Sequence, residues 1–237
     1  MAPVAQELAC HWGVLEPIQT AASLDGQIEE LRTILNNHGS LPVAAIGFSW
    51  GAWLAFIVSS RYPDLIRKLI LVSSGPFEEK YATGIQEVRM NRLSEEDRTE
   101  LKAVIMSLRD PASKDLNTLL DRLGALASKS DAFDPITHAS DNCRMVDARG
   151  TIFRDVWEAA AELRRSGALL EFGRQIQCPV VAIHGDYDPH PAEGVARPLK
   201  DILKDFRFVL LKDCGHKPWL ERRARDDFYR ILRAELP

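Results

Sequence analysis

The pattern of apolar and polar residues divides the chain into two outer stretches and a middle one. Short, predominantly apolar runs occur near the two ends, at 42–48, 66–72, 179–183 and 206–211, and the run at 42–48 is apolar throughout. Runs of this length without polar alternation are typical of strands in a parallel sheet that is covered on both faces. Between about residues 77 and 176 helical spacing dominates instead, so strands are expected on either side of a helical block.

Helix signals follow the apolar runs in alternation. Ser23 is a good N-cap for a helix over residues 24–37, and Ser94 caps another whose first turn is acidic. Helices are also expected over residues 1–9, 50–61, 78–92, 95–109, 113–128, 152–165, 193–204 and 218–236. The alternation predicts an α/β fold with a mostly parallel sheet flanked by helices. Residues 1–76 and 177–237 would form its core, and 77–176 an inserted helical cap.

One further strand is expected at Trp12–Gln19. Pro17 lacks a backbone N–H, so this strand should end early or lie irregularly.

Composition excludes several kinds of partner. The 237 residues are 46% hydrophobic and 27% charged, with a net charge of −4 and no basic stripe, so no nucleic-acid partner is expected. No apolar run approaches the roughly 18 residues of a membrane span, and the N-terminus does not read as a signal peptide. The cysteines Cys10, Cys143, Cys178 and Cys214 are scattered, without metal-binding spacing. We therefore expect small buried thiols, a cytoplasmic location and no membrane partner.

The motif that carries chemistry is GFSWG at residues 47–51. A bare Gly-x-Ser-x-Gly match is common in loops, but this one lies where an apolar strand becomes a helix, which is typical of a nucleophile elbow. Ser49 would be the nucleophile. Gly47 and Gly51 would be required because neighbouring backbone passes close by, and the Trp50 backbone N–H would bind an oxyanion.

A serine nucleophile needs a base and an orienting acid. Both are expected after the later strands, in the chain order serine, acid, histidine. His216 is the expected base. Asp188 is favoured as the acid over Asp186, which is suited to holding a turn. Among the other histidines, His184 is expected to be structural, and His190 to be a solvated residue or a substrate contact. Nothing in the neighbouring sequence indicates a functional role for the remaining three, which are His11, His38 and His138.

With these motifs the chain resembles the α/β-hydrolase superfamily. The matching segments are GFSWG (47–51), HGDYDPHP (184–191) and GHKPWLE (215–221), in the superfamily's order. The Ser-Trp-Gly variant is similar to that of proline-iminopeptidase-type and other small-acyl hydrolases. Members with an aspartate nucleophile are disfavoured, because position 49 is serine.

The resemblance implies a serine hydrolase that cleaves a small carboxylic ester through an acyl-enzyme, with no cofactor and no metal. Alternatives within enzymes are an aminopeptidase and a C–C hydrolase. The partner would be a small-molecule acyl substrate, and a homodimer is one assembly that the sequence leaves open.

One feature departs from the superfamily. Its glycine-rich oxyanion loop, which follows a strand and precedes the first helix, has no counterpart before Met1. We therefore expect either that residues 12–19 pair directly with the strand at 42–48, or that the chain is a fragment or an internal-start product. A truncated, non-catalytic or weakly active scaffold is the alternative function.

Overall fold

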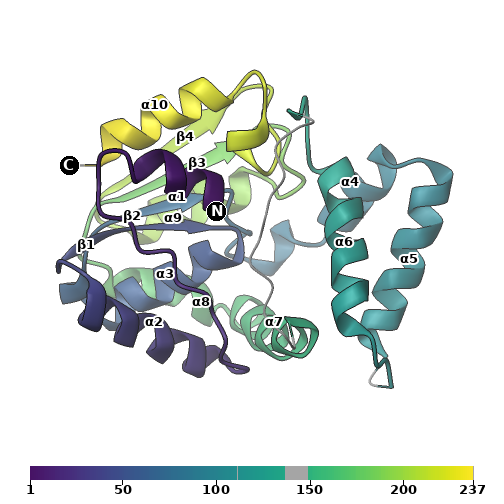
Figure 1. Ribbon diagram of the computed structural model, residues 1–237, viewed down its shortest axis with the longest axis horizontal. Coiled ribbons are helices and arrows are strands. Elements are labelled where there is room, and N and C mark those ends of the chain that lie inside the picture. Colours follow the sequence, from purple (N-terminus) through teal and green to yellow (C-terminus); the bar gives the residue numbers. More distant parts are fainter. Residues whose placement is uncertain (111, 137–148, 237) are drawn as a thin grey trace.

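A four-stranded parallel sheet organises the molecule. The computed structural model describes residues 1–110, 112–136 and 149–236. The strands are β1 (Val43–Phe48), β2 (Ile66–Val72), β3 (Val180–Gly185) and β4 (Phe206–Leu211), in the spatial order β1-β2-β3-β4 (Figure 1). All three pairings are parallel. The C-terminal ends of the strands therefore lie along one edge, where open α/β sheets place their ligands.

Both faces of the sheet are covered by helices, as continuously apolar strands require. Leu69 and Leu71 of β2 point into one core, and Ile70 and Val72 point into the other. The first core is covered by α2 (Leu24–His38), α3 (Trp50–Arg61) and α9 (Glu193–Ile202). The second is covered by α1 (Ala2–Leu8) and α10 (Arg225–Glu235). Short 3-10 turns η1 (Pro63–Leu65) and η4 (Pro218–Leu220) complete this part.

Helices fill the stretch between β2 and β3. They are η2 (Glu79–Tyr81), α4 (Ile85–Arg92), α5 (Glu95–Arg109), α6 (Leu116–Ser130), α7 (Arg149–Arg165), α8 (Ala168–Glu171) and η3 (Phe172–Gln175). In Figure 1, α4, α5 and α6 stand together beside the sheet, whereas α7 and α8 lie closer to α2 and α3. A small separate core of Leu93, Leu101 and Leu126 holds the first group together.

The expected elements are largely confirmed. The ranges 50–61, 66–72, 95–109 and 206–211 coincide with α3, β2, α5 and β4. Both predicted caps are present: Ser23 Oγ accepts from the Gly26 N–H at 3.1 Å, and Ser94 Oγ from the Asp97 N–H at 3.2 Å. The helix expected over 78–92 is interrupted before α4, whose N-cap is Gly84. The one expected over 218–236 divides into η4 and α10.

The strand expected at Trp12–Gln19 is wrong. These residues, all of which the structure describes, form no strand, and β1 is the edge of the sheet. Leu15 and Ile18 are exposed rather than covered. Directly after the segment, the Thr20 N–H donates to Glu30 Oε2 at 2.9 Å, so the chain there is bonded to a side chain of α2 rather than to a strand. Direct pairing with residues 42–48 therefore does not occur.

The cysteines differ in their surroundings. Cys214 is buried and Cys178 partly so, and burial raises the pKa of both thiols. Cys10 is exposed, so the expectation of burial is wrong there, while Cys143 lies outside the described residues. Within the described ranges, no helix combines the length and the apolar character that crossing a membrane requires.

Candidate active site

Ser49 occupies a strained turn between β1 and α3. Its backbone dihedrals are φ 53° and ψ −117°, a region that residues other than glycine rarely adopt. The Ser49 N–H still donates to the Val72 carbonyl at 3.0 Å, so the β1–β2 ladder continues up to the turn. Strain at a serine that lies between a strand end and the start of a helix is what the expected elbow requires.

The two elbow glycines are required to different degrees. A Cβ on Gly47 would lie 2.3 Å from the carbonyl oxygen of Gly51, so only glycine fits there. A Cβ on Gly51 would meet no described heavy atom within 4 Å, apart from nearby backbone of its own helix. The expected clash at Gly51 is therefore wrong, because α3 turns that position toward open space.

Trp50 is the first residue of α3. The first N–H groups of a helix have no partner within the helix, so the Trp50 N–H is available as an oxyanion donor. The indole Nε1–H of Trp50 donates to Gln27 Oε1 at 3.1 Å and ties the start of α3 to α2.

The structure brings Asp188 and His216 together from loops that follow β3 and β4. His216 Nδ1 lies 2.7 Å from Asp188 Oδ2, and the Asp188 side chain is fully buried. Because a carboxylate only accepts, the imidazole proton is on Nδ1. Asp186 Oδ1 instead accepts from the Cys214 N–H at 3.3 Å, which ties the loop after β3 to the loop after β4 rather than holding its own turn.

The His216 ring lies beside the residue that precedes Ser49. The ring centroids of His216 and Phe48 are 4.9 Å apart. Phe48 also packs edge-on against buried Trp219, with centroids 4.7 Å apart. Packing between the end of β1 and the loop after β4 therefore holds the imidazole near the elbow.

His190 is a site residue that sequence reasoning missed. Its Nδ1 lies 2.8 Å from Asp188 Oδ1, its ring centroid is 4.7 Å from that of His216, and its side chain is only 12% exposed. It is therefore not the solvated residue that was one expectation. The signal in the sequence is its spacing: two residues after an aspartate, with a proline between.

The other histidines are placed as follows. His184 is buried, as expected of a structural residue, and its Nε2 donates to the His190 carbonyl at 2.8 Å. His11 and His38 are exposed, and His138 lies outside the described residues.

Burial and neighbouring charges set the charge states of Asp188 and of the histidines around it. Burial by itself would raise the pKa of the Asp188 carboxyl, but the imidazoles of His216, His184 and His190 outweigh that effect and hold the pKa well below its ordinary value. Burial lowers the pKa of both His184 and His190, against the opposing effect of Asp188. The cluster is therefore an ionised carboxylate with neutral His184 and His190 beside it at neutral pH.

The same cluster has metal-ligand chemistry. Among the described residues, Asp188, His190 and His216 offer ligand atoms that all lie within 4.8 Å of one another. Each carboxylate oxygen is already matched to an imidazole Nδ1 at hydrogen-bond distance. Hydrogen bonding therefore accounts for the arrangement.

Two arginines of α4 connect the helical stretch to the loops that follow β3 and β4. Arg89 forms a bidentate ion pair with Asp131, whose own carbonyl accepts from the His216 N–H at 2.8 Å. Arg92 donates to the Tyr187 carbonyl at 2.8 Å and to the Ser130 carbonyl at 3.1 Å. The helical stretch therefore fixes the backbone on either side of the Asp188–His216 pair.

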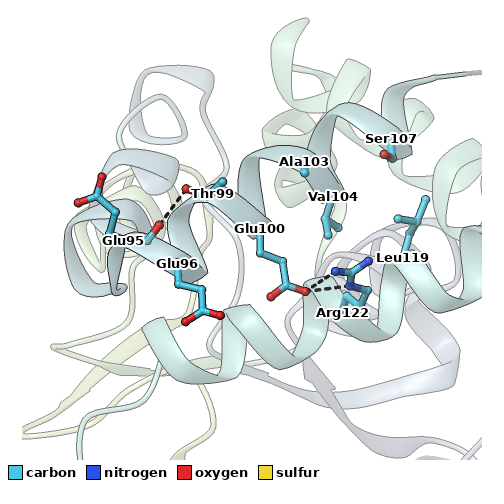
Figure 2. A pocket seen from close by; sticks show the side chains of 9 residues that line it. All are labelled: Glu95, Glu96, Thr99, Glu100, Ala103, Val104, Ser107, Leu119 and Arg122. Atoms are coloured by element: carbon cyan, nitrogen blue, oxygen red, sulfur yellow. Dashed lines mark hydrogen bonds and ion pairs between the residues drawn. The ribbon is translucent and has the colours of Figure 1, made fainter.

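A hollow of about 630 Å³ lies elsewhere, between α5 and α6. Figure 2 shows Glu100 on its wall turned toward Arg122, with which it forms an ion pair at 2.8 Å. None of its lining residues belongs to the cluster around Asp188.

Comparison with known proteins identifies the family of the fold. The family model described as alpha/beta hydrolase fold matches residues 16–222. The pimeloyl-[acyl-carrier protein] methyl ester esterase of Chromobacterium violaceum is 26% identical over 208 residues, which are 86% of this chain and 73% of that protein. The protein of the same name from Nitrosospira multiformis is 23% identical over 180 residues, 73% of this chain and 61% of that protein.

Among solved structures, the proline iminopeptidase of Mycobacterium smegmatis superposes with a TM-score of 0.54 at 15% identity, covering 90% of this chain and 72% of that one. The chain thus spans between three fifths and three quarters of the length of these relatives. Since the family model covers most of the sequence, the chain belongs to the alpha/beta hydrolase fold family.

Proposed function

We propose that the protein is a serine hydrolase that cleaves a small carboxylic ester. The observation that carries the proposal is the 2.7 Å contact between Asp188 Oδ2 and His216 Nδ1, with the His216 ring packed against Phe48, the residue before the strained Ser49. An acid–imidazole pair of this kind is what activates a serine hydroxyl.

Each residue has one role in this proposal. Asp188 holds the His216 imidazole with the proton on Nδ1, which leaves Nε2 unprotonated and able to accept the Ser49 proton. Ser49 Oγ then attacks the ester carbonyl, and the Trp50 N–H stabilises the oxyanion. His216 returns the proton to the leaving alkoxide, and an acyl-enzyme remains. Water, deprotonated by His216, releases the acid and regenerates Ser49.

The helical stretch 77–176 serves as a cap over the site in this proposal. Its contacts to the catalytic loops through Arg89 and Arg92 support that role. The ester class is favoured over a peptide amide or a C–C bond, because both curated relatives are named methyl ester esterases.

The experiment is steady-state hydrolysis of a p-nitrophenyl acyl ester series. We expect Ser49→Ala and Asp188→Asn each to lower kcat by about 10⁴-fold or more. The matched control is Ser73→Ala: Ser73 follows the neighbouring strand β2, is buried and also has a positive φ, of 45°. Turnover that Ser49→Ala leaves unchanged would contradict the proposal, and absence of turnover with every ester would favour the non-catalytic scaffold.

A further inference from the structure

Asp188 accepts hydrogen bonds from His190 as well as from His216. Its Oδ2 faces His216 Nδ1, while its Oδ1 accepts from both the ring Nδ1–H of His190 at 2.8 Å and the His190 backbone N–H at 3.0 Å. A buried carboxylate needs such donors, because unpaired charge inside a protein is costly. Each carboxylate oxygen is thus occupied by the Nδ1–H of a different imidazole, and the two rings lie side by side, with centroids 4.7 Å apart.

His190 is itself fixed by a third imidazole. His184 Nε2 donates to the His190 carbonyl at 2.8 Å and lies 3.6 Å from Asp188 Oδ2, beyond hydrogen-bond range. In the described part of the chain, His184 Nδ1 has no hydrogen-bond partner. The single proton of neutral His184 is therefore used on the His190 backbone, so among the described residues the hydrogen-bonded link from His184 to Asp188 runs through His190.

We propose that His190 is a positioning residue, which holds one oxygen of Asp188 so that the other stays aimed at His216. The inference rests on the proposed function, since it assigns His190 a part in the same site. Without the His190 ring, Oδ1 would keep only a backbone N–H, and the carboxylate could rotate away from His216.

The charge state of His190 fits a hydrogen-bonding role. Burial lowers its pKa, so the ring is neutral at neutral pH and donates from Nδ1 without adding a second cation beside His216. Because the carboxylate requires the proton on Nδ1, an amide N–H placed at the same distance from the backbone can replace it. Asparagine presents its amide nitrogen at that place, whereas leucine presents none.

The test compares His190→Leu with His190→Asn, and uses His38→Asn on an exposed histidine as control. We expect His190→Leu to lower kcat for a p-nitrophenyl ester by about tenfold to a hundredfold with little change in KM, since catalysis is sensitive to small misplacements. His190→Asn should restore most of kcat. Circular dichroism confirms that each variant is folded.

A second readout needs no substrate. Low-field proton NMR should show two imidazole N–H protons bonded to carboxylate in the wild type, with His216→Asn assigning the one that belongs to His216. His190→Asn should remove only the other resonance, and His190→Leu should also shift or broaden that of His216. An unmoved His216 resonance in His190→Leu, or a folded His190→Asn as slow as His190→Leu, would overturn the inference. Wild-type protein that shows the two resonances but does not react with a fluorophosphonate would defeat the proposed function alone.

Discussion

At the residue scale, only one of the two elbow glycines, Gly47, lies where a side chain would clash with neighbouring backbone. Gly47 → Ala would place a methyl group 2.3 Å from the Gly51 carbonyl, and backbone cannot move aside as a flexible side chain can. We expect a loss of about 1–3 kcal/mol in the free energy of unfolding, or more. Gly51 → Ala is the matched control, since its methyl group meets open space and alanine favours helix by up to about 1 kcal/mol. Urea denaturation of both variants measures the difference, and equal losses would show that the turn is looser than described.

The buried histidines predict how stability depends on pH. The pKa values of His184 and His190 are lowered in the fold, so the unfolded chain takes up protons first as pH falls below about 6.5. Stability should therefore be full above that pH and fall below it. Asp188, whose pKa is also lowered, adds a further loss only below about pH 4.

Chemical denaturation between about pH 7.5 and about pH 5.5 measures this dependence. Wild type should lose stability over the interval, and His190→Asn should lose less of it, because one fewer histidine changes its bound protons on unfolding. Identical slopes for the two proteins would contradict a neutral buried His190.

At the scale of elements, a largely buried ion pair between Arg89 and Asp131 links α4 to the loop that follows α6. The Asp131 side chain is 6% exposed and that of Arg89 is 21% exposed. Arg89→Ala leaves the carboxylate buried without its cation, which typically costs about 3–5 kcal/mol. The matched control is Arg122→Ala in the exposed pair with Glu100, where about 0–1 kcal/mol is expected. Urea denaturation compares the two, and a loss for Arg89→Ala as small as that of the control would show that the pair does not hold the loop.

Elements with local signals were predictable, and those that depend on distant neighbours were not. The side chains of Ser23 and Ser94 cap their helices by accepting from backbone N–H groups three residues further on, so sequence alone located both helix starts. Residues 12–19 contain apolar residues that are typical of a strand. A strand also requires a neighbouring strand to pair with, and the local sequence does not reveal whether one is present.

The same distinction applies to the candidate site. The pairing with His216 was predicted from chain order and from both loops lying at strand ends, and the choice of Asp188 over Asp186 also used the resemblance to the family. The orientation of His190 was not predicted, because it depends on His184 and on how the loop after β3 folds back over that strand. Gly51 was misjudged because the motif was treated as one steric unit, whereas only Gly47 faces passing backbone.

At the scale of the whole molecule, the account requires four distant segments to converge on one edge of the sheet. Ser49 follows β1, Asp188 follows β3, His216 follows β4, and the helices between β2 and β3 hold the last two loops in place. Parallel strands make this convergence a property of the topology, since every strand ends at the same edge.

The most direct test of this convergence is covalent labelling with a fluorophosphonate, followed by peptide mass mapping. We predict one label per molecule, on Ser49, which is lost in Ser49→Ala and retained in Ser73→Ala. His216→Ala should also suppress it, because the hydroxyl then lacks its base. A folded wild type that takes no label, or one labelled at a residue other than Ser49, would contradict the account.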